Sequence, residues 1–111
     1  MIVEERIYVL HTHCNVADYL KVYESEGMDV QMPILGACLG YFVCEVGTLN
    51  QLVHLWGYRD MVDRQLRRDR LAAEPRWQSC LAKLRPMIRT MENRILVPTH
   101  FSPLRELSLT P

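Results

Sequence analysis

The feature that most constrains the fold is a pair of apolar runs separated by only four residues. The runs, 37–46 and 51–58, are each long enough for a strand, and the Gly-Thr-Leu-Asn sequence between them suits a turn. Such a short connection joins antiparallel strands, because parallel strands need a crossover of a dozen residues or more. The sequence therefore predicts an antiparallel hairpin around which the rest of the chain must pack.

Capping signals and residue spacing outline the helices. Asn15 and Asp60 are typical helix N-caps, Gly27 is a typical stop, and Pro75 suits the first turn of a helix that resumes after an interruption. Residues 28–36 contain a proline and a glycine and are expected to form a loop. Helices are thus predicted from residue 15 to 27 and from residue 60 to 85, the second with a break near residue 74.

Two further strands complete the predicted sheet. Residues 2–10 place Val3, Ile7 and Val9 on one face of a strand, and residues 87–96 form a fourth strand. The resulting order of strand, helix, strand, strand, helix, strand predicts an α+β fold, ferredoxin-like βαββαβ, with a four-stranded antiparallel sheet and two helices on one face. A single domain over 1–111 is expected, with an extended tail at 98–111.

The sheet face without helices is expected to be apolar. If Val53 and Leu55 face the helices, the alternate residues of the same strand face the opposite way. Those residues are Leu52, His54, Trp56 and Tyr58. An exposed patch of this kind marks an interaction surface. We therefore expect a second copy of the chain to cover it, giving a homodimer with a shared, barrel-like interior.

The charge balance and the hydropathy restrict the possible partners. Lys plus Arg number 13 and Asp plus Glu number 13, whereas nucleic-acid binders need a basic excess. No stretch has the roughly 18–20 apolar residues of a membrane span, and residues 1–10 lack the pattern of an export signal. We expect a cytoplasmic protein with reduced thiols and with no nucleic-acid or membrane partner.

A group of arginines lies at and after the start of the second predicted helix. These side chains are candidates for an anion site, but Asp60, Asp63 and Asp69 are interspersed among them. Mixed signs are typical of a solvated helix face, which is favoured here over an anion site. The arginines are Arg59, Arg64, Arg67, Arg68 and Arg70.

Several separated segments resemble the NIPSNAP family, and together they span residues 2–105. They begin with Arg6-Ile7-Tyr8 and end with Phe101-Ser102-Pro103-Leu104. Between them lie LNQLVHLWGY at 49–58, DRQLRR at 63–68, EPRW at 74–77 and ENRILVPT at 92–99. Where family members commonly carry Pro-Gly after the first strand, this chain has His11-Thr12-His13-Cys14.

This resemblance implies a dimeric α/β barrel. The wider relatives of the family include cofactor-independent antibiotic-biosynthesis monooxygenases, haem-degrading oxygenases and stress-responsive barrel proteins. Eukaryotic NIPSNAP members are linked to mitochondria and vesicle traffic, whereas this chain resembles a stand-alone bacterial member.

Alternation in the strand over 51–58 brings polar aromatic side chains to one face, where residues of the first and fourth strands can join them. The candidate ligand-binding residues are Arg6, Tyr8, His54, Trp56, Tyr58 and Asn93. They are expected either to line a pocket that stacks an aromatic ligand or to fill a polar and aromatic dimer core. His54 is also the candidate catalytic residue, because the ordinary pKa of histidine suits a proton carrier.

Three functions stay open at this point. The leading one is a homodimeric barrel protein that binds a small apolar or aromatic molecule in its interior. The first alternative is a cofactor-independent monooxygenase acting on quinol-like aromatic substrates, with His54 as base, and the sequence does not decide whether the chain is an enzyme. The second is a structural or interaction module without a ligand. No cofactor is expected, and no metal site, because no second ligand cluster accompanies the turn at 11–14.

Overall fold

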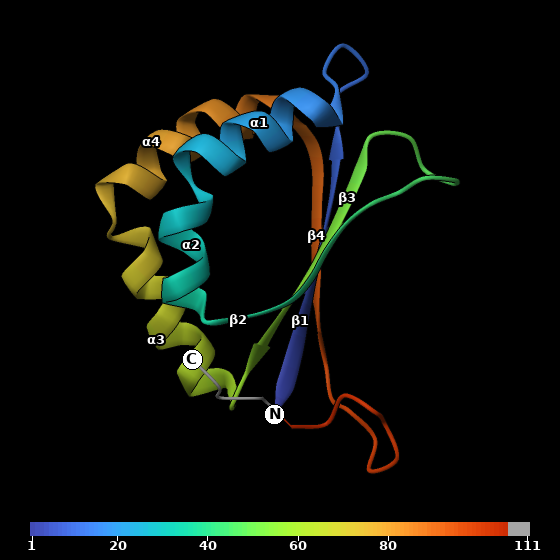
Figure 1. Ribbon diagram of the computed structural model, residues 1–111, viewed down its shortest axis with the longest axis vertical. Helices are drawn as coiled ribbons and strands as arrows, with labels where there is room; N and C mark the ends of the chain where they lie inside the picture. The colour runs from blue at the N-terminus through green and yellow to red at the C-terminus, as the bar shows by residue number, and fades with distance from the viewer. Residues whose placement is uncertain (107–111) are drawn as a thin grey trace.

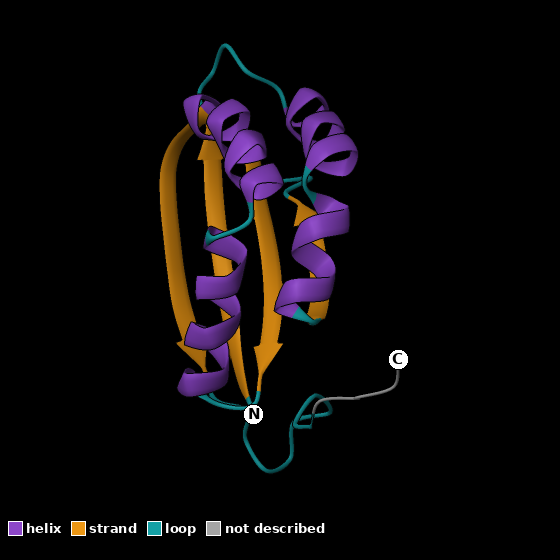
Figure 2. Ribbon diagram, turned by 90° about the vertical axis from the view of Figure 1, so that its left-hand side faces the viewer, coloured by secondary structure: helices purple, strands orange, loops and turns teal. Residues whose placement is uncertain are grey.

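Four strands form one antiparallel sheet in the computed structural model, which describes residues 1–106. The strands are β1 (Ile2–Leu10), β2 (Ala37–Val43), β3 (Gln51–Tyr58) and β4 (Ile88–Leu96), in the spatial order β2-β3-β1-β4. Figures 1 and 2 show that the helices all lie on one side of this sheet. The predicted α+β, ferredoxin-like fold is therefore confirmed, although β2 ends at Val43 rather than at residue 46.

The helices form two interrupted pairs. The first pair is α1 (Val16–Glu26) and α2 (Met28–Leu35); the second is α3 (Met61–Ala72) and α4 (Pro75–Leu84), which continues into the 3-10 turn η1 (Arg85–Met87). Both predicted caps are confirmed, since the Asp18 backbone N–H donates to Asn15 Oδ1 and the Asp63 backbone N–H donates to Asp60 Oδ1, each at 2.8 Å. Among residues 1–106, no helix has the length and apolar character needed to cross a membrane.

The prediction of a loop over 28–36 is wrong, because α2 occupies most of it. The helix begins directly after Gly27, and Pro33 lies inside it. A proline in a helix removes one backbone hydrogen bond, which is why its presence favoured a loop. Here the loss is offset by burial of Val30 and Leu35 against the core, which stabilises the helix more than the missing bond destabilises it.

The face of β3 that meets the helices is the main correction to the sequence analysis. Leu52, His54 and Trp56 are at most 1% exposed, and Leu52 and Trp56 belong to the core that includes side chains of all four α-helices. Val53 and Leu55 therefore lie on the helix-free face. The predicted assignment had the two faces exchanged, because alternation shows which residues share a face without showing which face is covered.

The helix-free face is nevertheless rich in apolar side chains. Val3, Ile7 and Val9 share one face of β1, as predicted, and the strand register places Ile7 beside Val53 of β3. Phe42 of β2 is 53% exposed on this side. An antiparallel sheet that packs one face against its own helices usually has a polar outer face, so this apolar surface departs from that rule.

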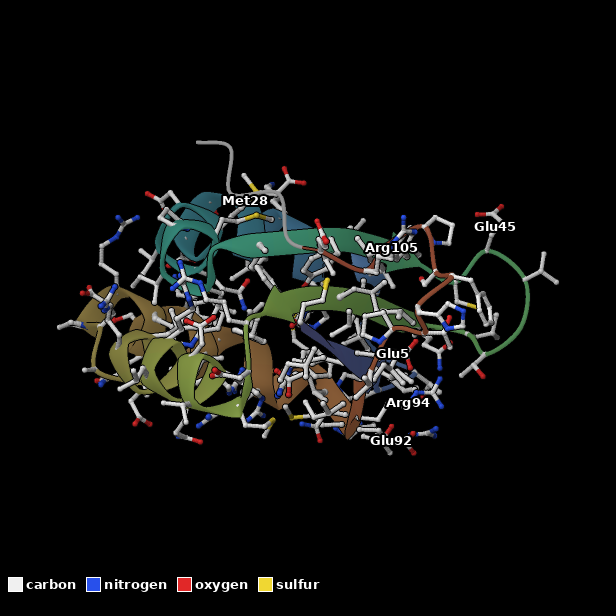
Figure 3. The ribbon with its side chains drawn as sticks, turned by 90° about the horizontal axis from the view of Figure 1, so that it is seen from below. Glu5, Met28, Glu45, Glu92, Arg94 and Arg105 are labelled. Carbon is white, nitrogen blue, oxygen red and sulfur yellow. The ribbon has the colours of Figure 1, made fainter. Side chains whose placement is uncertain are left out.

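The charged part of the helix-free face is confined to the β1–β4 side of the sheet. Glu5 lies opposite Arg94 in the strand register, and the two side chains form an ion pair. Figure 3 shows both of them near Glu92, away from the helices. Charge and apolar surface are thus segregated across this face rather than mixed.

Candidate functional site

A cavity of about 70 Å³ lies between the sheet and its helices. The sheet contributes Arg6, Tyr8, Tyr41 and His54 to its lining, and the helices contribute residues of α1, α2, α3 and α4. A volume of this size holds several ordered waters, or part of a small organic molecule, since one water needs roughly 10–15 Å³. The space between the two layers is therefore not completely filled by side chains.

A larger hollow of about 370 Å³ lies outside this cavity. It is formed by α3, α4 and η1 alone, and it shares five lining residues with the cavity. The shared residues are Arg68, Leu71, Trp77, Leu81 and Arg85. These side chains, which we call the neck, are the boundary between the outer hollow and the cavity. A molecule entering between α3 and α4 would pass the neck to reach the sheet.

Stacked and edge-on rings form one wall of the cavity. The His54 ring stacks on Tyr41 with centroids 4.6 Å apart, and Tyr41 stacks in turn on Tyr23 at 5.2 Å. Tyr8 meets His54 edge-on at 4.9 Å. A wall of flat rings with a few polar atoms is typical of sites that bind planar apolar molecules.

His54 presents a hydrogen-bond donor rather than a base. The Trp56 Nε1–H donates to His54 Nδ1 at 2.7 Å, so Nδ1 is an acceptor and the proton of the neutral ring is on Nε2. Burial, together with the charge of Arg6, lowers the pKa of His54 from 6.5 to about 3, which keeps the ring neutral. Its Nε2 is buried and has no partner among the residues that the structure describes. The candidate role of His54 as base is therefore not supported, because neither nitrogen has a free lone pair.

Glu4 is a buried anion whose importance the sequence analysis missed. Its side chain is fully buried, and its Oε2 accepts hydrogen bonds from Arg64 at 2.7 Å, Asn93 at 2.8 Å and Arg6 at 3.2 Å. Burial acts to raise the pKa of Glu4, but the hydrogen bonds from Arg64 and Asn93 and the charge of Arg6 outweigh it and lower the pKa below 4.5. Glu4 is thus ionised and fixes the side chains of three different elements.

The interpretation of the arginine group as a solvated helix face is wrong for its central members. Arg64, Arg67 and Arg68 are half-buried, and Arg64 and Arg68 are directed at Glu4. Arg68 is held only loosely, since its Nη1 lies 3.9 Å from Glu4 Oε1, beyond hydrogen-bond distance. The two members that are exposed, as expected, are Arg59 and Arg70.

The structure divides the predicted site residues into two groups. Those that line the cavity are Arg6, Tyr8 and His54. The others support them or lie apart: Trp56 hydrogen-bonds to His54, Asn93 hydrogen-bonds to Glu4, and Tyr58 is fully buried, with a hydroxyl that has no partner in the described part of the chain. The lining residues that sequence reasoning missed come mainly from the helices, because the faces of β3 had been exchanged.

The turn at 11–14 does not contribute to the cavity. The His11 and His13 rings stack on each other with centroids 5.3 Å apart. Within residues 1–106, no three His, Cys, Asp or Glu side chains gather in a way that could hold a metal ion.

Together these observations define a ferredoxin-like α+β protein with a cavity between its sheet and its helices. The model of the NIPSNAP family matches residues 3–103, and the chain belongs to that family. A NIPSNAP family protein from Agrobacterium tumefaciens is 49% identical, with a TM-score of 0.90 over 94% of this chain and 98% of the other. A NIPSNAP-like domain protein from Burkholderia xenovorans is 46% identical, with a TM-score of 0.87 over 99% and 95%.

Other similarities are more distant or cover less of the proteins compared. The Drosophila melanogaster Protein NipSnap is 39% identical over 62 residues, which are 56% of this chain and 23% of the fly protein. The chain thus spans about a quarter of that curated relative's length. An antibiotic biosynthesis monooxygenase is similar in fold, with 12% identity and a TM-score of 0.63 over 89% of this chain and 99% of the other.

Proposed function

We propose that the protein binds a small aromatic molecule in the cavity between its sheet and its helices. The observation that carries this proposal is the buried, unpartnered Nε2–H of His54 on an aromatic wall. A buried donor without an acceptor costs about 1–3 kcal/mol, so such groups normally meet a partner. An oxygen atom of a planar ligand would accept this hydrogen bond while its ring contacts the aromatic side chains of the cavity wall.

We also propose that the protein forms a homodimer, with one such site in each chain. A second copy would cover the apolar residues of the helix-free face, among them Ile7, Val53 and Phe42. The ligand would not lie between the two copies, because the cavity is enclosed by the sheet and helices of a single chain. The dimer would therefore support the sheet from behind the site.

The oxygenase alternative has less support from the same geometry. In that reaction a base removes a proton from a quinol-like substrate before dioxygen reacts with it. His54 cannot take this role while Trp56 donates to its Nδ1. It could only donate from Nε2 to a developing oxyanion, which would leave the deprotonation to another group. We therefore favour binding over oxygenation.

Calorimetric titration with 2-naphthol, a neutral ring with one oxygen, tests the binding proposal. We expect saturable binding that becomes about tenfold weaker in His54→Leu, because the donor is lost, and that is largely restored in His54→Gln. The matched control is His13→Leu, which removes an exposed histidine outside the cavity lining and should leave the affinity unchanged. Absence of binding to the wild-type chain, or equal affinity of wild type and His54→Leu, would contradict the proposal.

A further inference from the structure

We infer that the molecule bound in the cavity carries an acidic group, which lies at the neck between Arg68 and Arg85. This inference rests on the proposed binding function and adds the charge of the ligand to it. Both arginines line the cavity and the outer hollow, so they stand where a molecule in the cavity meets the opening.

The positive charge of the residues that line the cavity is the first argument for an acidic ligand. Arg6, Arg68 and Arg85 line the cavity, and neither the cavity nor the outer hollow has an aspartate or glutamate among its lining residues in the described part of the chain. Cationic groups that surround a partly enclosed space repel one another and attract an anion. A neutral ligand would leave the charge of these arginines unbalanced.

The three arginines differ in whether their N–H donors already have partners within the protein. Arg6 is engaged, because its Nε donates to Tyr8 and its Nη1 to Glu4. Arg68 lies near Glu4, at 3.9 Å, and near the Tyr58 hydroxyl, but the described residues give it no hydrogen bond of ordinary geometry. Arg85 is exposed and forms no ion pair with any residue in 1–106. The two arginines of the neck therefore keep donors free for a carboxylate, which a guanidinium binds with two parallel hydrogen bonds.

The nearby carboxylate does not neutralise this charge. Glu4 carries one negative charge and has three arginines around it, Arg6, Arg64 and Arg68, of which the first two hydrogen-bond to its Oε2. The buried network therefore has an excess of positive charge on the side that faces the cavity. An anion at the neck would balance this excess without disturbing Glu4.

The positions of the polar groups also give the ligand a direction. His54 lines only the cavity, whereas Arg68 and Arg85 line the cavity and the outer hollow. A matching molecule has an acceptor oxygen at its inner end, a flat ring in the middle and an acidic group at its outer end. Hydroxyaryl carboxylates have this arrangement.

The test compares two probes that differ in one carboxylate, 2-naphthol and 6-hydroxy-2-naphthoate, by calorimetric titration at low salt. We expect the carboxylate to bind wild type at least tenfold more tightly than 2-naphthol. This advantage should disappear in Arg68→Met and in Arg85→Met, which keep most of the side-chain length but lack the charge. Arg70→Met is the matched control, because Arg70 is exposed on α3 and lines neither space.

The outcomes separate the two proposals. Equal affinity for both probes would overturn the acidic ligand and leave the binding function standing. Failure of both probes to bind would overturn the binding function itself. An equal loss in Arg70→Met would show that the whole basic surface, rather than the neck, attracts the anion, and would also overturn the inference. Because Arg85 is exposed, Arg85→Met keeps the test valid even if Arg68→Met folds poorly.

Discussion

The two faces of the sheet differ in how each one holds its polar and apolar side chains. The face under the helices carries Glu4, Arg6 and His54 beside the apolar core, whereas the helix-free face carries Ile7 of β1 and Val53 of β3 beside the Glu5–Arg94 ion pair. Burying polar groups costs free energy unless they are hydrogen-bonded, and burying aliphatic groups does not. The inner face therefore matches the proposed ligand site, and the outer face matches the proposed partner chain.

Of the substitutions that test this difference between the faces, replacement of the buried Glu4 carboxylate is expected to change the free energy of unfolding most. Glu4→Gln removes the one charge that pairs with three arginines, so it should lower the free energy of unfolding by about 3–5 kcal/mol. Glu5→Gln is the matched control on the other face, where the Arg94 side chain is mostly exposed, and should cost about 1 kcal/mol or less. Urea unfolding of both variants measures the difference, and equal losses would show that the two faces do not differ in this way.

A charge placed on the aliphatic face tests the proposed dimer. Val53→Glu puts a carboxylate beside Ile7 and should weaken association about a hundredfold, since about 3 kcal/mol of burial is lost and an unpaired charge is introduced. Analytical ultracentrifugation over a concentration series reports the change.

The control for the dimer test is Leu66→Glu, which alters an exposed apolar residue of α3 instead. This substitution should leave the oligomeric state, measured as the mass of the sedimenting species, unchanged. A wild-type chain that is monomeric at micromolar concentration would remove the need for a partner on the sheet.

A smaller effect is expected from pH, and it arises on the inner face alone. The pKa of His54 is about 3 in the folded chain and about 6.5 when unfolded, so the unfolded chain binds more protons between these values. Stability therefore falls as pH decreases, by about 2 kcal/mol from pH 7.5 to 5. Glu4, whose pKa is lowered on folding, adds a further loss as the pH falls below 4.5.

Thermal unfolding of His54→Gln against wild type isolates this contribution. The variant lacks the titrating ring, so it should lose less stability than wild type between pH 7.5 and 5. The same loss in both proteins would mean that His54 does not account for the acid sensitivity of the fold.

The sequence determined the elements better than it determined their orientation. The hairpin and the caps at Asn15 and Asp60 depend on local chemistry, and they were predicted correctly. The inward face of β3 depends on where the helices pack, which alternation alone does not contain. The same is true of α2, since burial of Val30 and Leu35 is a tertiary effect that overrides a local proline.

Part of the candidate site could have been found with a closer reading of spacing. Arg64 and Arg68 are four residues apart, so they lie on one face of a helix, and Glu4 alternates with Arg6 on one face of β1. These spacings place two arginines on one face of the helix and a carboxylate on one face of the strand, so the two elements could pair through opposite charges. The pairing becomes decisive only once α3 is known to pack over β1 and β3, which requires the three-dimensional structure.

The hydrogen bond from Trp56 to His54 has a consequence for selectivity. It fixes the tautomer of the ring, so the inner end of the cavity always offers a proton and never a lone pair. Ammonium groups, which can only donate, would be rejected there, while ethers, ketones and phenolates would be accepted. Because the lowered pKa of His54 keeps the ring neutral at pH values far below the physiological range, this discrimination between donors and acceptors would not change with the pH of a living cell.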